Sequence, residues 1–339
     1  MLTGLRFAAQ LITHPKRRTP YDVVTHLLAV QAQDLRGARL AIRARSLGTT
    51  ASDVDRALTD DRSLLVTWLN RGTLHLVAAE DYWWLQALTT PPIVTSNARR
   101  LGQEGVSPDA AERGVTAIVR ALGDGPLTRN QLREHVTAAG VPVAGQAMVH
   151  LLLLASLRGH VVRGPVVAGG DQAFVLVRDW LGKGPRVDRN AALGELAVRY
   201  LRGHGPATDA DLARWAKLPL RDARSGLAAI ADRLIELDGG LVDLAPRRRT
   251  PKLPPPRLLG PFDPVLLGWC DRDDIVAGAT GLVTNNGLFR PFALVDGQAA
   301  AIWSLAGGEV TLSPVRQLTS QQQAALDTEA VDVLRFLAN

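Results

Sequence analysis

The chain has 339 residues, long enough for two or more domains, and a net charge of +6. No run of 18 apolar residues occurs and the first residues are too polar for a signal peptide, which argues against membrane and secreted proteins. The single cysteine, Cys270, excludes an internal disulfide framework and a cysteine-based zinc cluster. We therefore expect a cytoplasmic protein, and the charge suits a nucleic acid partner, although an arginine-rich proteome would produce the same balance.

Three helices and one strand are predicted near the N-terminus. Thr19 and Pro20 are typical of a helix start, and Asp34 is typical of the N-cap of a second helix. Apolar residues then alternate with polar ones, which suits a strand that forms a wing. The expected helices cover 20–30, 34–45 and a segment that begins at 53–58, and the expected strand lies within 66–77.

Two segments in the middle of the chain share the pattern G-x-G-P-x-T-x-x-x-L. They read GDGPLTRNQL at 123–132 and GHGPATDADL at 203–212, which suggests a duplicated unit. In each, glycine ends one helix, proline prevents its continuation, and threonine caps the next helix. The residue three positions after each threonine, a Gln or an Asp, completes a capping box.

Each repeat continues with a further helix and two short strands. Three helices with a hairpin form a winged helix. The expected helices are 146–157 and 221–234, and the expected strand pairs are 160–163 with 173–178 and 235–237 with 241–243. The helix at 146–157 is almost entirely apolar, so we expect it to be buried and structural, where a DNA-reading helix would carry polar and basic residues.

The chain changes character after Pro246. A basic, proline-rich linker, PRRRTPKLPPPR, precedes segments that predict strands at 275–279, 288–295, 299–303 and 310–314 and a final helix at 320–337. The predicted fold class is therefore α+β, with tandem winged-helix modules followed by a C-terminal β-rich domain. The expected domains are 1–105, 106–185, 186–250 and 257–339.

Two glutamines, Gln31 and Gln33, stand between the first two predicted helices. If the backbone is extended there, both amides point to the same side and Ala32 to the other. Two amides can hold and orient one water molecule, since each offers two donors and two acceptor lone pairs. The alternative is that both side chains satisfy exposed helix ends.

Three segments together resemble the AlkZ-like DNA glycosylases, a winged-helix family. They are VQAQDLRGARLAIRAR, TWLNRGTLHLVAAEDYWW and LLGPFDPVLLGWCDRDDIV, and the resemblance spans nearly the whole chain. In this family a Gln-aliphatic-Gln or Gln-aliphatic-Asp motif carries catalysis. The resemblance therefore implies that Gln31 and Gln33 are catalytic, that no metal or organic cofactor is needed, and that the partner is double-stranded DNA with alkylated purines. It also implies either self-resistance to a DNA-alkylating metabolite or housekeeping repair, and we expect a monomer.

The chemistry of such a motif is consistent with a charged lesion. Most glycosidases use two carboxylates, one of which protonates the leaving group. A purine alkylated at N7 already carries a positive charge and leaves without that acid. Neutral hydrogen-bonding groups can then supply the positioning of water.

The remaining candidates concern DNA contact. Arginines after the motif could follow a phosphate backbone or form a solvated face, His75 could face a cleft or be an ordinary core histidine, and the hairpin tip TNNGLFR could enter a minor groove or be a simple turn. The candidate DNA-binding residues are Arg36, Arg39, Arg43, His75, Asn285, Asn286 and Arg290. Asp34 is expected to be a helix cap more than a charged participant. The acidic run at 271–274 is expected to be a solvated loop and not a metal site.

A non-enzymatic winged-helix regulator is the alternative function. A regulator commonly binds a palindrome as a symmetric dimer, whereas a glycosylase is expected to bind as a monomer without sequence preference.

Overall fold

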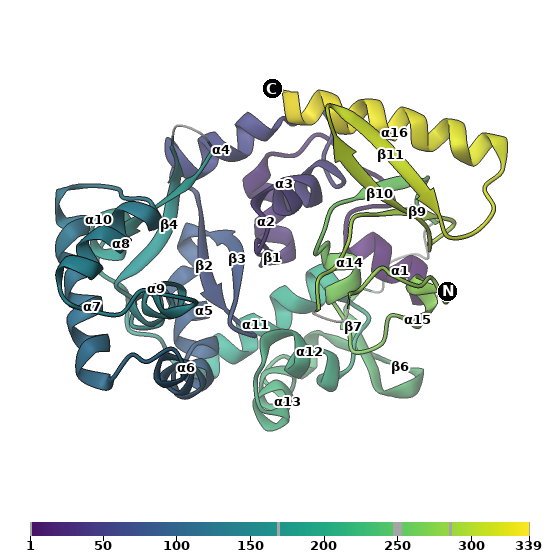
Figure 1. Cartoon of the computed structure of the whole chain (residues 1–339). Helices are drawn as coiled ribbons and strands as arrows, with labels where there is room; N and C mark the ends of the chain where they lie inside the picture. The colour runs from purple at the N-terminus through teal and green to yellow at the C-terminus, as the bar shows by residue number, and fades with distance from the viewer. Residues whose placement is uncertain (1, 168–169, 247–252, 285–286, 339) are drawn as a thin grey trace. The chain divides into compact units, whose positions relative to one another are not determined.

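The computed structural model describes residues 2–167, 170–246, 253–284 and 287–338. Contacts between residues group the chain into two compact units. Figure 1 shows the whole chain, coloured by residue number. The central unit is Asp55–Asp188, and the split unit combines the chain before Asp55 with the chain after Asp188. The expected boundary at 185/186 lies near one edge of the central unit, whereas the expected boundary at 105/106 lies inside it. The division into winged-helix modules remains a prediction.

The central unit surrounds an antiparallel sheet in the order β3-β2-β4-β5. The strand expected within 66–77 is present as β3, and it pairs with a second strand, β2, that was not expected. Asn70 and Gly72 adopt positive φ and turn the chain between the two strands. Burial of α9 confirms that the apolar helix is structural. The elements are the end of α4 (Ala51–Thr59), β2 (Leu64–Leu69), β3 (Thr73–Ala78), η1 (Ala79–Asp81), α5 (Tyr82–Thr89), α6 (Pro91–Gln103), α7 (Pro108–Ala121), η2 (Leu122–Asp124), α8 (Arg129–Ala138), α9 (Ala147–Leu157), β4 (Val161–Val166), β5 (Gln172–Leu176) and α10 (Val177–Trp180).

The split unit joins N-terminal helices to the C-terminal half of the chain (Figure 1). Helix α11 packs against α1, α2 and α13, and α16 packs on β8, β11 and α3. The N-terminal elements are α1 (Leu2–Ala9), α2 (Pro20–Leu27), β1 (Val30–Gln31) and α3 (Leu35–Arg43). The middle elements are α11 (Arg189–His204), α12 (Asp209–Ala216), α13 (Leu220–Ala228), η3 (Ala231–Arg233), β6 (Leu234–Leu237), η4 (Asp238–Gly240) and β7 (Leu241–Leu244).

The C-terminal part of the split unit contains a sheet in the order β11-β10-β9-β8. The elements of this C-terminal part are β8 (Arg257–Leu259), α14 (Pro264–Leu267), α15 (Asp273–Val276), β9 (Phe292–Val295), β10 (Gln298–Ala306), β11 (Glu309–Pro314) and α16 (Ser320–Ala338). The strand expected at 275–279 is wrong, because Asp273 and Asp274 begin the short helix α15 there. Strand β8 was not expected, since it lies at the end of the proline-rich linker. In the part of the chain that the structure describes, no helix is long and apolar enough to cross a membrane.

Helix caps are the local feature that the sequence predicts best. The capping boxes at Thr128 and Thr208 are both present, each with hydrogen bonds in both directions. Thr19 forms a third capping box with Asp22 at the start of α2. Because these caps satisfy amide groups that no helical bond can satisfy, they fix where each helix begins.

Candidate active site

The Gln-Ala-Gln segment lies at the junction between α2 and α3, as expected. Helix α2 ends at Leu27, Val30–Gln31 is extended, and Asp34 caps α3 through a 3.2 Å hydrogen bond from the Gly37 amide. Gln31 is buried, with 7% of its surface exposed, whereas Gln33 is exposed. The two amides therefore differ in access to solvent, which the expectation that both point to the same side did not anticipate.

Helix α3 is packed very closely against the segment that follows β8. A Cβ atom on Gly37 would lie 2.6 Å from the carbonyl oxygen of Pro261, and one on Gly260 would lie 2.9 Å from Cβ of Leu40. Neither position has room for a larger side chain. Two of the three segments that carry the family resemblance therefore meet directly, and the first turn of α3 is fixed where it follows Gln33.

A buried ion pair fixes the end of α3. Both carboxylate oxygens of Asp263 accept hydrogen bonds from the Arg45 guanidinium, at 2.8 and 2.9 Å, and both side chains are fully buried. Arg45 also donates to the carbonyl of Ala41 and to the side chain of Gln10. The guanidinium is thus held by charge and by hydrogen bonds together, which a buried cation requires.

Arg43, expected to contact DNA, lies instead inside the split unit. Its guanidinium donates to Glu329 and Asp332 of α16, each at 2.8 Å, and to the carbonyl of Leu258 at 2.7 Å. Only 1% of its side chain is exposed. We therefore remove Arg43 from the DNA-contacting set: it is a structural tie between α3, β8 and α16. Arg36 is exposed on the same helix, so Arg36 and Arg43 do not form one DNA-facing surface.

His75 is also a core residue. It lies on β3 of the central unit, 3% exposed, and Nδ1 lies 2.9 Å from the carbonyl oxygen of Thr73. Burial, assisted by the charge of Arg71, lowers the pKa of His75 to about 3. The imidazole is therefore neutral at physiological pH and cannot neutralise a phosphate. The sequence pattern was misleading because both faces of β3 are covered, although its residues alternate between apolar and polar.

Three other residues that were expected to contact DNA are at least partly exposed. Arg36 is exposed and Arg39 is half-buried on α3. Arg290 is exposed beside a hairpin that is closed by a bridge between Val283 and Phe289. Asn285 and Asn286, which the sequence predicts at the hairpin tip, lie outside the described residues.

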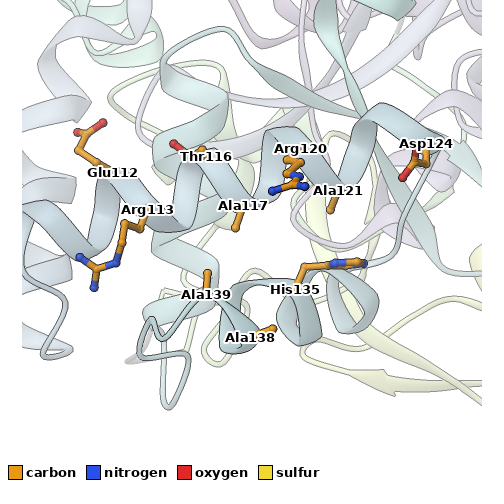
Figure 2. Close-up of a pocket in the computed structure, with 10 residues that line it drawn as sticks. All are labelled: Glu112, Arg113, Thr116, Ala117, Arg120, Ala121, Asp124, His135, Ala138 and Ala139. Atoms are coloured by element: carbon orange, nitrogen blue, oxygen red, sulfur yellow. The ribbon is translucent and has the colours of Figure 1, made fainter.

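Sequence reasoning missed a groove on the surface of the central unit. Figure 2 shows it between α7 and α8, with alanines from both helices and charged side chains around them. Its volume is about 710 Å³, and its charged and titratable lining residues are Glu112, Arg113, Arg120, Asp124 and His135. Both signs of charge are present, so the groove does not form a basic track. Within the described residues, no three His, Cys, Asp or Glu side chains are grouped to hold a metal ion.

Comparison with known proteins identifies the family. The family model described as DNA glycosylase AlkZ-like matches residues 24–336. The chain belongs to the AlkZ-like DNA glycosylase family. It is therefore a DNA glycosylase, and the regulator alternative is excluded. An "Interstrand DNA cross-link repair glycosylase" from Streptomyces sahachiroi is 27% identical, over 97% of this chain and 94% of the relative. The solved structure of Streptomyces sahachiroi DNA glycosylase AlkZ has the same fold, with a TM-score of 0.82 at 24% identity over 99% of this chain and 95% of that one.

Proposed function

We propose that this glycosylase hydrolyses the N-glycosidic bond of N-alkylated purines in double-stranded DNA, including bulky and cross-linked N7-alkylguanines. In this proposal Gln31 and Gln33 orient the attacking water. The family match supports the reaction, and the name of the relative, a cross-link repair glycosylase, supports the lesion class. Release of one strand from an interstrand-cross-linked duplex by the purified enzyme tests the cross-linked part of this substrate range.

The reaction balances without an acid on the leaving group. Water oxygen bonds to C1′ as the bond from C1′ to N9 breaks. The N7-alkylated purine departs as a neutral base, because its positive charge is cancelled by the bonding electrons, and the water proton passes to solvent. An amide can accept a hydrogen bond from that water and direct its lone pair, but it does not retain the proton.

One observation carries the assignment: Gln31 and Gln33 occupy the short junction between α2 and α3, which is extended at Val30–Gln31 and bends at Gln33. The backbone that follows Gln33 is fixed by the packing of α3. The Asp34 cap, the close packing at Gly37 and the buried Arg45–Asp263 pair all restrain the helix that follows. A rigid backbone at this place matters, because in catalysis by positioning even small displacements of the reacting groups lower the rate. The exposed Gln33 and the buried Gln31 would bring one amide from each environment to the water.

We propose that DNA binding is electrostatic and independent of sequence, and that the enzyme acts as a monomer. Arg36, Arg39 and Arg290 remain the proposed phosphate contacts near the junction and the hairpin, with Asn285 and Asn286 as proposed groove contacts. Affinity should fall steeply with salt, because each phosphate contact releases condensed counterions.

The test is single-turnover release of 7-methylguanine by Gln31→Ala and Gln33→Ala. We expect a loss of about 10²-fold or more in the chemical step with nearly unchanged DNA affinity, by analogy with the loss of one preorganised donor. Gln321→Ala is the matched control, since this exposed glutamine lies at the start of α16. Circular dichroism checks the fold. Excision at the wild-type rate by both alanine variants would show that the segment is only a helix junction.

Gln33→Glu separates positioning from charge. The substitution keeps the shape of the side chain and adds a carboxylate, which stabilises a developing oxocarbenium ion. We expect this variant to retain substantial excision activity where Gln33→Ala does not. Equal loss in both variants would mean that the amide hydrogens of Gln33 are required.

A further inference from the structure

A small polar pocket in the central unit lies where α8 begins, beside strands β4 and β5. Its volume is about 240 Å³, and it is lined by residues 128–130, by Arg163 of β4, and by residues 171, 172 and 174 at the start of β5. None of these residues belongs to the Gln-Ala-Gln segment or to the proposed contacts around it. The pocket is therefore a separate feature of the molecule.

Arg163 is held rigidly in this pocket. It pairs with Val66 of β2 on one side and with Phe174 of β5 on the other. Its guanidinium carbon lies 5.3 Å from the ring centre of Trp68 and 5.0 Å from that of Phe174. Aromatic faces stabilise a cation at this distance and restrict its movement. The guanidinium is consequently fixed before any ligand arrives.

Two buried donors at the pocket lack an acceptor. In the described part of the chain, Nε of Arg163 and Nε2 of Gln172 are buried without a hydrogen-bond partner. The pKa of Arg163 is lowered to about 10 by burial and, less strongly, by the charge of Arg129. Arg163 therefore remains charged at neutral pH. Among the described residues Arg163 forms no ion pair, and a largely buried cation without one is costly. A bound anion would reduce this cost.

The start of α8 brings further positive potential to the same place. Thr128 caps the helix and satisfies the amide of Gln131, while the first two helical amides, those of Arg129 and Asn130, make no intrahelical bond. Backbone hydrogen bonds in both directions between Leu127 and Phe174, at 3.2 and 2.8 Å, tie the helix start to β5. Two arginines and a helix N-terminus thus meet at one pocket, the arrangement that favours a phosphate.

We propose that this pocket binds one phosphodiester group of the DNA backbone, held between Arg129 and Arg163 at the N-terminus of α8. The inference rests on DNA being the partner in the proposed function. Exposed Asp171 also lines the pocket, and its carboxylate opposes a doubly charged anion more than the single charge of a diester. A backbone phosphate therefore fits better than free phosphate. The central unit would then contribute to DNA binding directly.

The test measures binding of undamaged duplex DNA as a function of salt. Arg129→Gln removes an exposed side chain and is expected to fold. We expect roughly tenfold weaker binding near physiological salt, the scale of a hydrogen bond to a charged group. The slope of log Kobs against log salt should become less steep by about 0.9, the loss of one phosphate contact. Arg163→Gln should give the same change in slope, and Asp171→Asn should tighten binding.

Arg133→Gln is the control, because Arg133 lies on the same helix but does not line the pocket. An unchanged slope in Arg129→Gln, or an equal change in Arg133→Gln, would overturn the proposal. Stabilisation of the wild type by inorganic phosphate that Arg129→Gln loses, with an unchanged DNA slope, would also overturn it and indicate a free-anion site. Binding to undamaged DNA involves no excision, so this result is separate from that of the Gln31 and Gln33 variants.

Discussion

Arg45 and Asp263 show how a single pair of residues can control the position of a helix. Their ion pair is fully buried, and Asp263 also accepts a hydrogen bond from the amide of Val265 at the start of α14. Because each charge has lost its hydration, each depends on the other. The pair joins residues 218 positions apart in the sequence.

Asp263→Asn should therefore destabilise the split unit strongly. The substitution preserves shape but leaves Arg45 as an uncompensated buried charge, and we expect a loss of about 3 kcal/mol in the free energy of unfolding. Urea unfolding measures it. Asp61→Asn is the control, because the Arg56–Asp61 pair is more than half exposed and should contribute less than about 0.5 kcal/mol. A similar small effect at both positions would contradict the importance of the buried pair.

A side chain at position 37 is excluded by lack of space and not by the backbone conformation. Gly37→Ala places Cβ 2.6 Å from a backbone carbonyl oxygen, so α3 must shift away from Pro261. We expect a loss of about 1–3 kcal/mol in stability, the usual cost of overpacking, together with slower base excision. In Gly194→Ala the nearest contact is an ordinary 3.5 Å, so this helical control should be neutral or stabilising. Equal stability of the two variants would show that α3 moves freely.

At the scale of elements, the capping box at the start of α2 should contribute to stability. Thr19 accepts a 3.1 Å hydrogen bond from the Asp22 amide, and Asp22 accepts a 2.8 Å bond from the Thr19 amide. Thr19→Ala should cost about 1 kcal/mol of stability, and Thr19→Ser should restore most of it. Thermal unfolding compares the three proteins. If serine fails to rescue, the methyl group of threonine, and not its hydroxyl, is what matters.

Much of the local structure could be predicted from the sequence, because its signals are local. Thr128, Thr208 and Asp34 were each expected to cap a helix, and each side chain accepts a hydrogen bond from the amide three residues later. The final helix, expected at 320–337, is observed at Ser320–Ala338. Such features depend on hydrogen bonds between near neighbours, which residue type alone can indicate.

The errors concern residues whose environment is set by distant parts of the chain. Arg43 looks like a surface residue of an amphipathic helix until α16, nearly 300 residues later, supplies Glu329 and Asp332. His75 alternates with apolar residues but both faces of its strand are covered. The Gln-Ala-Gln segment stands out in the sequence, but its catalytic role is implied only by the family resemblance, and the different burial of its two amides depends on tertiary packing.

At the scale of the whole molecule, buried histidines make stability depend on pH. Burial is the main cause that lowers the pKa of His75, in the central unit, and of His204, in the split unit, to about 3. The unfolded chain binds a proton at each site near pH 6.5, and the folded chain does not until about pH 3. Stability is therefore complete above pH 6.5 and is lost as the pH falls from 6.5 towards 3.

The expected loss is up to about 1.4 kcal/mol per pH unit for each histidine within that range. Urea unfolding at pH 7, 6 and 5 measures it. His75→Asn and His204→Asn keep a donor near the position of Nδ1 but do not titrate, so each should make the pH dependence shallower. Parallel curves for the wild type and both variants would assign the acid sensitivity to other groups.

The split unit also has a consequence for synthesis on the ribosome. Domains generally fold as the chain emerges, starting from the N-terminus. The central unit is continuous and has all its residues once Asp188 has emerged, but residues before Asp55 need partners that are made last, including Glu329 of α16. Arg43 and Arg45 must therefore remain hydrated through most of translation. The packing of α3 that holds the Gln-Ala-Gln segment can be completed only after α16 has been synthesised.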